Sequence, residues 1–222
     1  MKCSIKIFAI LSTILLFTEF LSIGCAGISL SQKERDAISA ISINREVIKP
    51  NEAFYYGPEQ TAALTRALIS ATTKSGDRTN ATSDEETYNG KQLAEFIIKE
   101  KINIGEIVVK SLEDQISETK VFTITNTGSE KATLKIEIRI YGLGQSTGFS
   151  STLYPELGVL ARLVKPDSTI IWQKYDLVTP QNSENKEGDT LENYFNDSRK
   201  LRSAFVNVSR IVARLLVADL AK

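Results

Sequence analysis

The strongest constraint on the fold is a run of alternating apolar and polar residues over residues 132–142. Every second position in this run holds a large aliphatic side chain, at Leu134, Ile136, Ile138 and Ile140. Successive side chains of a strand point to opposite faces of a sheet. The run therefore predicts a strand with one wet face and one apolar face, and the apolar face requires a covering layer.

Helices predicted elsewhere in the chain can form the layer that covers this apolar face. Residues 105–118 carry Val108, Leu112 and Ile116 at steps of four, the spacing of one helix face. A longer pattern of the same kind predicts a closing helix over residues 198–220. We expect two more helices over residues 58–74 and 91–101, separated by a polar loop at 75–90.

The remaining periodic segments predict strands over residues 38–48 and 120–126, and a hairpin of residues 157–164 and 169–178 around a turn at 165–168. The element order is then β-α-α-α-β-β-β-β-α. This order favours a two-layer α+β fold, in which a mainly antiparallel sheet is covered on one face by helices that include the long C-terminal one.

The first 24 residues have the features of an export signal. Lys2 and Lys6 give a positive start, and the apolar stretch at 7–17 is shorter than the roughly 20 residues of a membrane span. Residues 21–25 then resemble a lipobox, in which a small residue, here Gly24, precedes a cysteine that is acylated. The position three residues before Cys25 is serine instead of the usual leucine.

We therefore expect a signal peptide at residues 1–24, a lipid such as palmitate on Cys25, a tether at 25–37 and a single domain at 38–222. The acyl chains would anchor the domain to a membrane. A plain cleaved signal peptide and an uncleaved N-terminal anchor are the alternatives.

Composition excludes several kinds of chemistry. The chain has no histidine, which removes the usual catalytic base and the usual metal ligand. Its two cysteines, Cys3 and Cys25, both precede the domain, so the domain holds neither a disulfide nor a thiolate metal site. The 27 basic and 27 acidic residues balance, which disfavours nucleic acid as a partner. We expect no cofactor and no metal.

Aromatic side chains near the predicted ends of elements are the candidate contacts for a partner or ligand: Tyr55, Tyr56, Phe149, Tyr154 and Trp172. Exposed aromatic clusters are typical of binding surfaces. The alternative is that these rings close the ends of the core. Glu137, Glu156 and Asp176 could do acid–base work only if two of them faced each other across a cleft, and their spacing does not predict such a pair.

Several segments resemble small uncharacterised lipoproteins of bacterial envelopes: residues 140–143, 154–157, 161–163, the Ile171-Trp172 pair and the end of the chain from Asn193 to Leu216. Similar folds occur in lipoprotein subunits of curli-type secretion pores and in the first domain of TolB-like proteins. The resemblance implies a part of an envelope assembly, not an enzyme.

These observations lead to one expected function and one alternative. We expect a non-enzymatic, membrane-anchored scaffold or accessory subunit of an envelope complex, with an envelope protein or a second copy of the chain as its partner. The outer membrane is the favoured location, with the domain facing the periplasm or the exterior. The alternative is a lipoprotein that binds a small ligand or a glycan.

Overall fold

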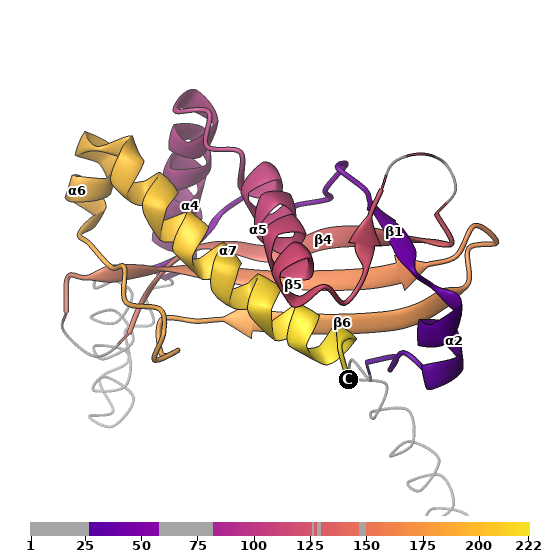
Figure 1. The fold of residues 1–222 in the computed structure, drawn as a ribbon. Coiled ribbons are helices and arrows are strands. Elements are labelled where there is room, and N and C mark those ends of the chain that lie inside the picture. The colour runs from indigo at the N-terminus through magenta and orange to yellow at the C-terminus, as the bar shows by residue number, and fades with distance from the viewer. Residues whose placement is uncertain (1–26, 58–81, 126, 128–129, 147–149) are drawn as a thin grey trace, which may run out of the picture.

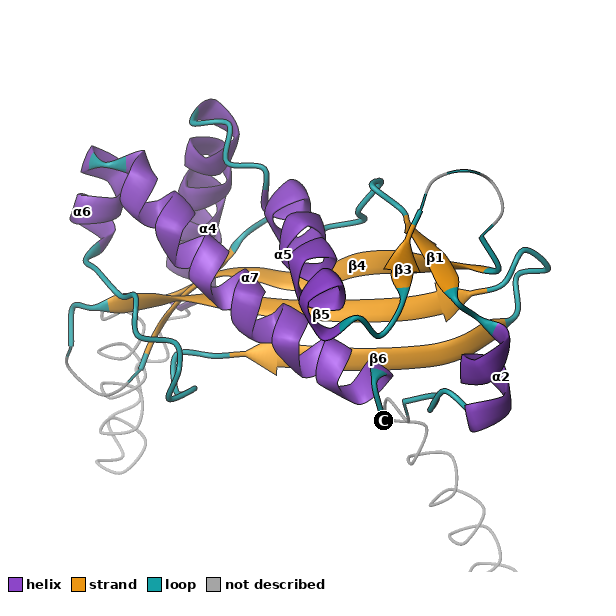
Figure 2. Ribbon diagram, viewed as in Figure 1, coloured by secondary structure: helices purple, strands orange, loops and turns teal. Residues whose placement is uncertain are grey.

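The computed structural model describes residues 27–57, 82–125, 127, 130–146 and 150–222. A six-stranded sheet carries helices on one face, which confirms the predicted two-layer α+β class (Figure 1). Figure 2 shows helices α4 (Thr82–Lys99), α5 (Ile104–Thr119) and α7 (Ser198–Leu220) on the same side of the strands.

The sheet has the order β3-β1-β4-β5-β6, and β2 pairs with the far part of β4. Its long strands are β4 (Ala132–Gln145), β5 (Leu153–Val164) and β6 (Ile170–Val178), which pair antiparallel. Three short strands, β1 (Ala40–Ile43), β2 (Phe54–Tyr56) and β3 (Thr123–Ile124), pair in parallel. The antiparallel hairpin of β5 and β6 confirms the predicted one.

A register shift between Ile138 and Ile140 changes which residues of β4 face the helices. Before the shift the core face holds Leu134, Ile136 and Ile138, as predicted. Arg139 is an extra residue at the shift, so the alternation reverses and Tyr141 becomes a core residue. The prediction that Ile140 shares the face of Ile138 is therefore wrong.

The helices α5 and α7 cover the sheet with the apolar faces that the sequence predicts. Asn103 begins α5 by accepting a hydrogen bond from the backbone N–H of Glu106, and Lys120 ends it in a left-handed conformation at φ 55°. The buried side chains of the two helices form the core with β4, β5 and β6. Among them are Leu112, Ile116, Leu201, Phe205, Val212 and Leu216.

The segment before α5 differs in part from the prediction. The loop expected at 75–90 is wrong from Thr82 onward, because α4 begins there and continues to Lys99. The helix expected over 58–74 lies outside the described residues, as do the leader, Cys25 and Phe149.

The segment expected to act as a tether is folded where it is described. Ile28 and Gln173 exchange backbone hydrogen bonds of 2.9 Å, which adds a short rung at the edge of β6. Ser31 then caps the six-residue helix α2 (Gln32–Ala37). We call residues 28–38 the strap. None of the helices in the described ranges has the length and apolar character needed to cross a membrane.

The molecule has two distinct ends along its long strands (Figure 1). At the first lie the strap, the turn at 165–168 and the C-terminal end of α7; we call it the anchor end because the strap follows Cys25, the expected lipid site. At the opposite, distal end lie β2, the start of β5 and the short helix α6 (Leu191–Asn196). Tyr154 and Val164 are ten residues apart in β5, so about 33 Å of strand separates the two ends.

Candidate functional site

The register of the sheet brings two of the predicted aromatic residues together at the distal end. Tyr56 of β2 and Tyr154 of β5 are both paired with Gly144 of β4. The residue before Gly144, Leu143, is fully buried on the helix side. Side chains at positions 56 and 154 therefore belong to the helix-free face of the sheet. We call Tyr56, Gly144 and Tyr154 the distal aromatic row.

The next register position on the same face, at Gly142, adds further residues to this site. Phe54 and Glu156 are both paired with Gly142, one step further along the strands. A Cβ on Gly142 would overlap the backbone carbonyl of Phe54, so only glycine lets β2 approach so closely. A Cβ on Gly144 would lie 3.1 Å from the Glu156 carboxylate and 2.9 Å from the ring of Pro180. The ring of Phe54 would lie 3.6 Å from the same Cβ, so a carboxylate and the rings of Pro180 and Phe54 surround the position of Gly144, which has no side chain.

Glu156 is the ionisable group of this site. It is half-buried, and no side chain in the described ranges donates a hydrogen bond to it or forms an ion pair with it. Its burial raises the pKa of the carboxyl above the usual value. A desolvated, uncompensated carboxylate beside aromatic rings can accept a cationic group or the hydroxyl groups of a polar ligand.

The other predicted residues lie elsewhere. Tyr55 points to the opposite face of β2 and is 5% exposed. Trp172 belongs to the anchor end, is 1% exposed, and donates a 3.1 Å hydrogen bond from Nε1 to Asp219. Tyr56 and Tyr154 are thus brought together, whereas Tyr55 and Trp172 contribute to the core.

The three carboxylates considered for acid–base work are not brought together. Glu137 lies on the helix-free face and pairs with Arg139 and Arg162 at 2.9 and 3.1 Å. Glu156 lies further along that face, and Asp176 is on the helix side, where its register partner is the buried Val159. Burial raises the pKa of Asp176, and one of its carboxylate oxygens has no hydrogen-bond partner in the described part of the chain.

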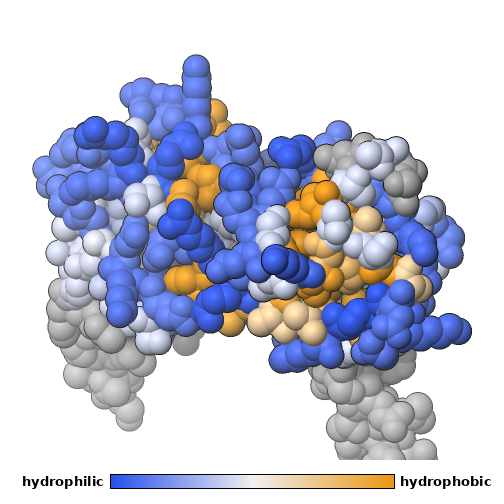
Figure 3. All heavy atoms as spheres, viewed as in Figure 1, coloured by the Kyte–Doolittle hydropathy of each residue, from blue (hydrophilic) through white to orange (hydrophobic). Residues whose placement is uncertain are grey.

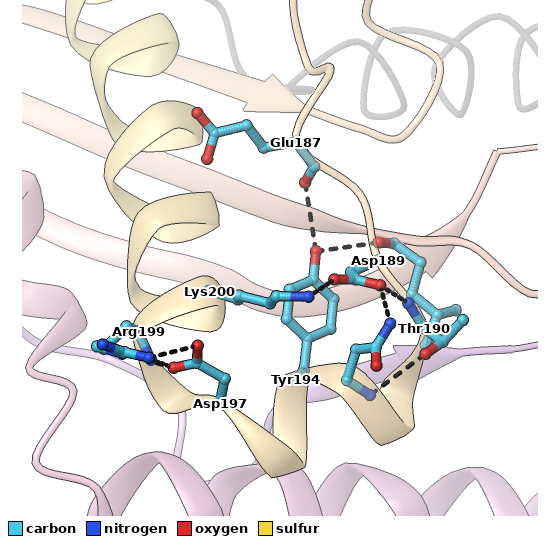
Figure 4. Close-up of polar contacts among 9 residues, drawn as sticks. Glu187, Asp189, Thr190, Tyr194, Asp197, Arg199 and Lys200 are labelled. Carbon is cyan, nitrogen blue, oxygen red and sulfur yellow. Dashed lines mark hydrogen bonds and ion pairs between the residues drawn. The ribbon is translucent and has the colours of Figure 1, made fainter.

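A polar network secures the distal end around helix α6 (Figure 4). The carboxylate of Asp189 accepts hydrogen bonds from Lys200, from Asn193 and from the backbone of Thr190, at 2.6 to 2.8 Å. These donors lower the pKa of Asp189 to about 2. The network therefore ties the start of α7 to the loop that precedes α6.

The same network reaches the sheet through Tyr194. Its hydroxyl lies 3.2 Å from the carbonyl of Leu153 and 3.3 Å from that of Glu187, and its burial raises the pKa of the phenol. Asp197 caps α7 and pairs with Arg199 at 2.9 Å (Figure 4). We interpret these contacts as the support that holds the first residues of β5, and hence Tyr154, in place.

A groove of about 390 Å³ lies beside the N-terminus of α5. Two of its cations already have partners: Arg45 forms a 2.6 Å ion pair with Glu113, and Lys49 lies 5.2 Å from the centre of the Tyr141 ring. The remaining lining residues are Val47, Asn103, Gly105, Glu106 and Val109. In the described part of the chain, no group of three acidic, thiol or imidazole side chains could hold a metal ion.

The surface on the helix side is mostly polar, with one exception near the anchor end. Figure 3 shows apolar atoms gathered over β1 and β3, between α2 and the C-terminal ends of α5 and α7. Half-buried apolar residues of these elements and of the link between α5 and β3 are Val121, Ile124 and Leu215. The helices thus cover the apolar sheet face less completely at this end, where these three side chains stay half-buried.

Sequence reasoning missed part of the distal site for a local reason. Phe54 belongs to a strand of only three residues, which is too short to show an alternating pattern. The signal that could have located the site is the pair of glycines at 142 and 144, because glycine inside a strand often marks a close approach of another backbone.

No family model matches the chain, and the search of curated proteins found no match. Among solved structures, a Xanthomonas campestris protein of family DUF330 is 9% identical, with a TM-score of 0.42 over 81% of each chain. A minor lipoprotein from Acinetobacter baumannii is 12% identical, with a TM-score of 0.30 over 51% of this chain and 85% of that one. A lipoprotein from Neisseria meningitidis is 14% identical, with a TM-score of 0.26 over 81% of this chain and 99% of that one. At these scores and identities the likenesses do not establish a family for this chain.

Proposed function

We propose that the chain is a lipid-anchored protein of the bacterial envelope that acts as a scaffold or accessory subunit and not as an enzyme. One observation carries the proposal: the described chain begins two residues after Cys25 at one end of the sheet, while the distal aromatic row lies at the other end. An anchored protein with its binding surface away from the anchor is suited to hold a partner at a fixed distance from a membrane.

The anchor in this proposal is the acylated Cys25 of the lipobox-like segment 21–25. The outer membrane is its favoured location, with the domain facing the periplasm or the exterior. The resemblance to lipoprotein subunits of curli-type pores and to the first domain of TolB-like proteins fits a role in an assembly. The partner is an envelope protein or a second copy of the chain, and not nucleic acid.

The absence of catalysis is also part of the proposal. The full sequence has no histidine. Its candidate carboxylates lie on different faces or at different positions of the sheet, so no two of them flank a bond as a catalytic pair would.

Site-specific photo-crosslinking tests the proposal. A benzophenone amino acid at Tyr56 should crosslink, in whole cells, to one reproducible protein or to a second copy of the chain. The matched control is the same substitution at Ile98, which is 69% exposed on α4. A strictly monomeric protein that gives no crosslink at Tyr56, or the same crosslinks at both positions, would contradict the proposal.

The alternative function, binding of a small ligand or glycan, is favoured by Glu156, which has no partner among the described residues and shares the helix-free face with Phe54, Tyr56 and Tyr154. A carboxylate and aromatic faces are the groups that lectin-like sites use for hydroxyl and apolar sugar surfaces. Isothermal titration with soluble envelope glycans decides between the two functions. Saturable binding that is lost in Tyr154→Ala would favour the ligand-binding function over the scaffold.

A further inference from the structure

The strap leaves almost no free chain between the proposed lipid and the folded domain. Three peptide steps separate Cys25 from Ile28, which is hydrogen-bonded to Gln173 in both directions. Fully extended, three residues reach at most about 10 Å. If Cys25 carries a lipid, as proposed above, the edge of β6 at Gln173 must therefore lie close to the lipid headgroups.

The strap is also fastened along its length. Leu30 and Ile38 are 8% and 4% exposed, so both ends of α2 are packed against the core. Arg35 donates a 2.6 Å hydrogen bond to the carbonyl of Leu220 at the end of α7. The strap also forms a 2.8 Å ion pair between Glu34 and Lys165 and accepts a 2.8 Å hydrogen bond from Lys131 at the carbonyl of Ala37.

These contacts reach three separate parts of the fold: the turn between β5 and β6, the start of β4 and the end of α7. A flexible linker would let the domain tumble beside its anchor. Because the strap is held at several points, the orientation of the domain relative to the lipid is fixed.

The surface next to the strap is apolar on both sides of the sheet. Ile28 and Ile170 are 41% and 39% exposed, and their register partners Gln173 and Val164 place them on the helix-free face. On the helix side, the patch of half-buried apolar residues Val121, Ile124 and Leu215 lies beside α2 (Figure 3). Exposed apolar side chains on one face of this end, and half-buried ones on the other, fit a surface that lies against lipid.

The charges of this end do not favour a strongly acidic lipid surface. The exposed or half-buried charged residues of this end are nearly balanced: the cations are Lys33, Arg35, Lys131, Lys165, Lys174 and Lys222, and the anions are Glu34, Asp36, Glu130, Asp167 and Asp219. Contact with the membrane therefore depends on the acyl chains and on apolar area, and hardly on the charge of the headgroups.

We infer that the anchor end of the domain rests on the bilayer surface in a fixed orientation, with Ile28, Ile170 and the patch beside α2 against the lipid. This inference rests on the proposed lipid at Cys25. The long strands then point away from the membrane, and the distal aromatic row stands about 33 Å above the contact. The distal aromatic row, which is the proposed partner surface, is then held at a fixed distance from the membrane and does not move on a flexible linker.

Lipid-quenching of a site-specific fluorophore tests this orientation. The mature chain has no cysteine other than Cys25, so a cysteine introduced by Ile28→Cys or Ile170→Cys is the one free thiol of acylated protein. Ile98→Cys on α4 is the matched control, because it is the same substitution at an exposed position. Each protein is extracted from membranes, labelled, and placed in phosphatidylcholine vesicles that carry a nitroxide on the headgroup.

The expected result is several-fold stronger quenching at positions 28 and 170 than at 98. A second variant tests the strap: ten Gly and Ser residues inserted after Cys25 add about 17 Å of reach and should reduce quenching at position 28 toward that at 98. Equal quenching at all three positions in acylated, vesicle-bound protein would overturn the inference and leave the anchor intact. Protein whose intact mass shows no acyl group would overturn the proposed anchor and this inference with it.

Discussion

Glu156 shows how burial changes the pKa of a carboxyl that has no partner among the described residues. Burial raises the pKa of this group, so its charged form is less stable in the folded protein than in the unfolded chain. The folded state binds more protons than the unfolded state as the pH rises past about 4.5, the ordinary value. The contribution of Glu156 to stability is therefore lost as the pH rises through its folded-state pKa.

The substitution Glu156→Gln tests this account. It should raise the melting temperature at pH 7, because it removes a desolvated charge, and have little effect at pH 3, where the carboxyl is protonated in both states. Thermal denaturation followed by circular dichroism at the two pH values measures the difference. The control is Glu95→Gln, at an exposed position of α4. A stability gain of the same size at pH 3 and pH 7 would show that the charge is not the cause.

Asp189 is the opposite case, because three donors stabilise its charged form and lower its pKa to about 2. This contribution to stability is present above the unfolded value of 3.8 and is lost as the pH falls toward 2. We expect Asp189→Asn to destabilise the fold by about 1–2 kcal/mol at pH 7. Urea denaturation at pH 7 and pH 2 checks this, and a loss that persists at pH 2 would contradict it. A double-mutant cycle with Lys200→Met isolates the ion pair.

At the scale of elements, the sequence predicted best the segments whose periodicity extends over many residues. The stripes of α5 and α7 repeat over several turns, and the alternation of β4 and of the β5–β6 hairpin over many residues, so each identifies its element without tertiary information. The helices α2 and α6 have six residues each, and β2 has three. Segments that short depend on caps and on distant partners, which a linear pattern does not contain.

The register with which the strands pair could not be predicted from the sequence either. The parallel pairing of β1 and β2 with β4 joins segments about 90 residues apart. The shift at Arg139 reverses the face of every later residue in β4. The distal row depends on both features, which explains why the sequence named Tyr56 and Tyr154 as candidates but grouped them with Tyr55 and Trp172.

The pairing of β2 with β4 gives a prediction for Gly142. In Gly142→Ala the new methyl group would overlap the carbonyl of Phe54, so β2 must move away from β4. We expect a loss of about 1–3 kcal/mol of stability and faster amide hydrogen exchange in residues 54–56. Exchange followed by mass spectrometry would show both effects. Unchanged exchange in this strand would mean that β2 does not lie against Gly142.

For the whole molecule, the strap determines how the domain and its anchor are connected. Arg35→Ala removes the hydrogen bond to Leu220, so we expect the amides of Ile28 and Gln173 to exchange faster, with a stability loss of about 1 kcal/mol. Lys33→Ala, at an exposed position of the same helix, is the control. Equal exchange in the two variants would show that Arg35 does not fasten the strap.

The account depends most of all on the lipid at Cys25, and the intact mass of protein extracted from membranes tests it directly. We predict a mass equal to that of residues 25–222 plus acyl groups, and the loss of these groups and of membrane association in Cys25→Ala. An unmodified, soluble protein of wild-type sequence would contradict the account and leave an exported binding protein as the better description.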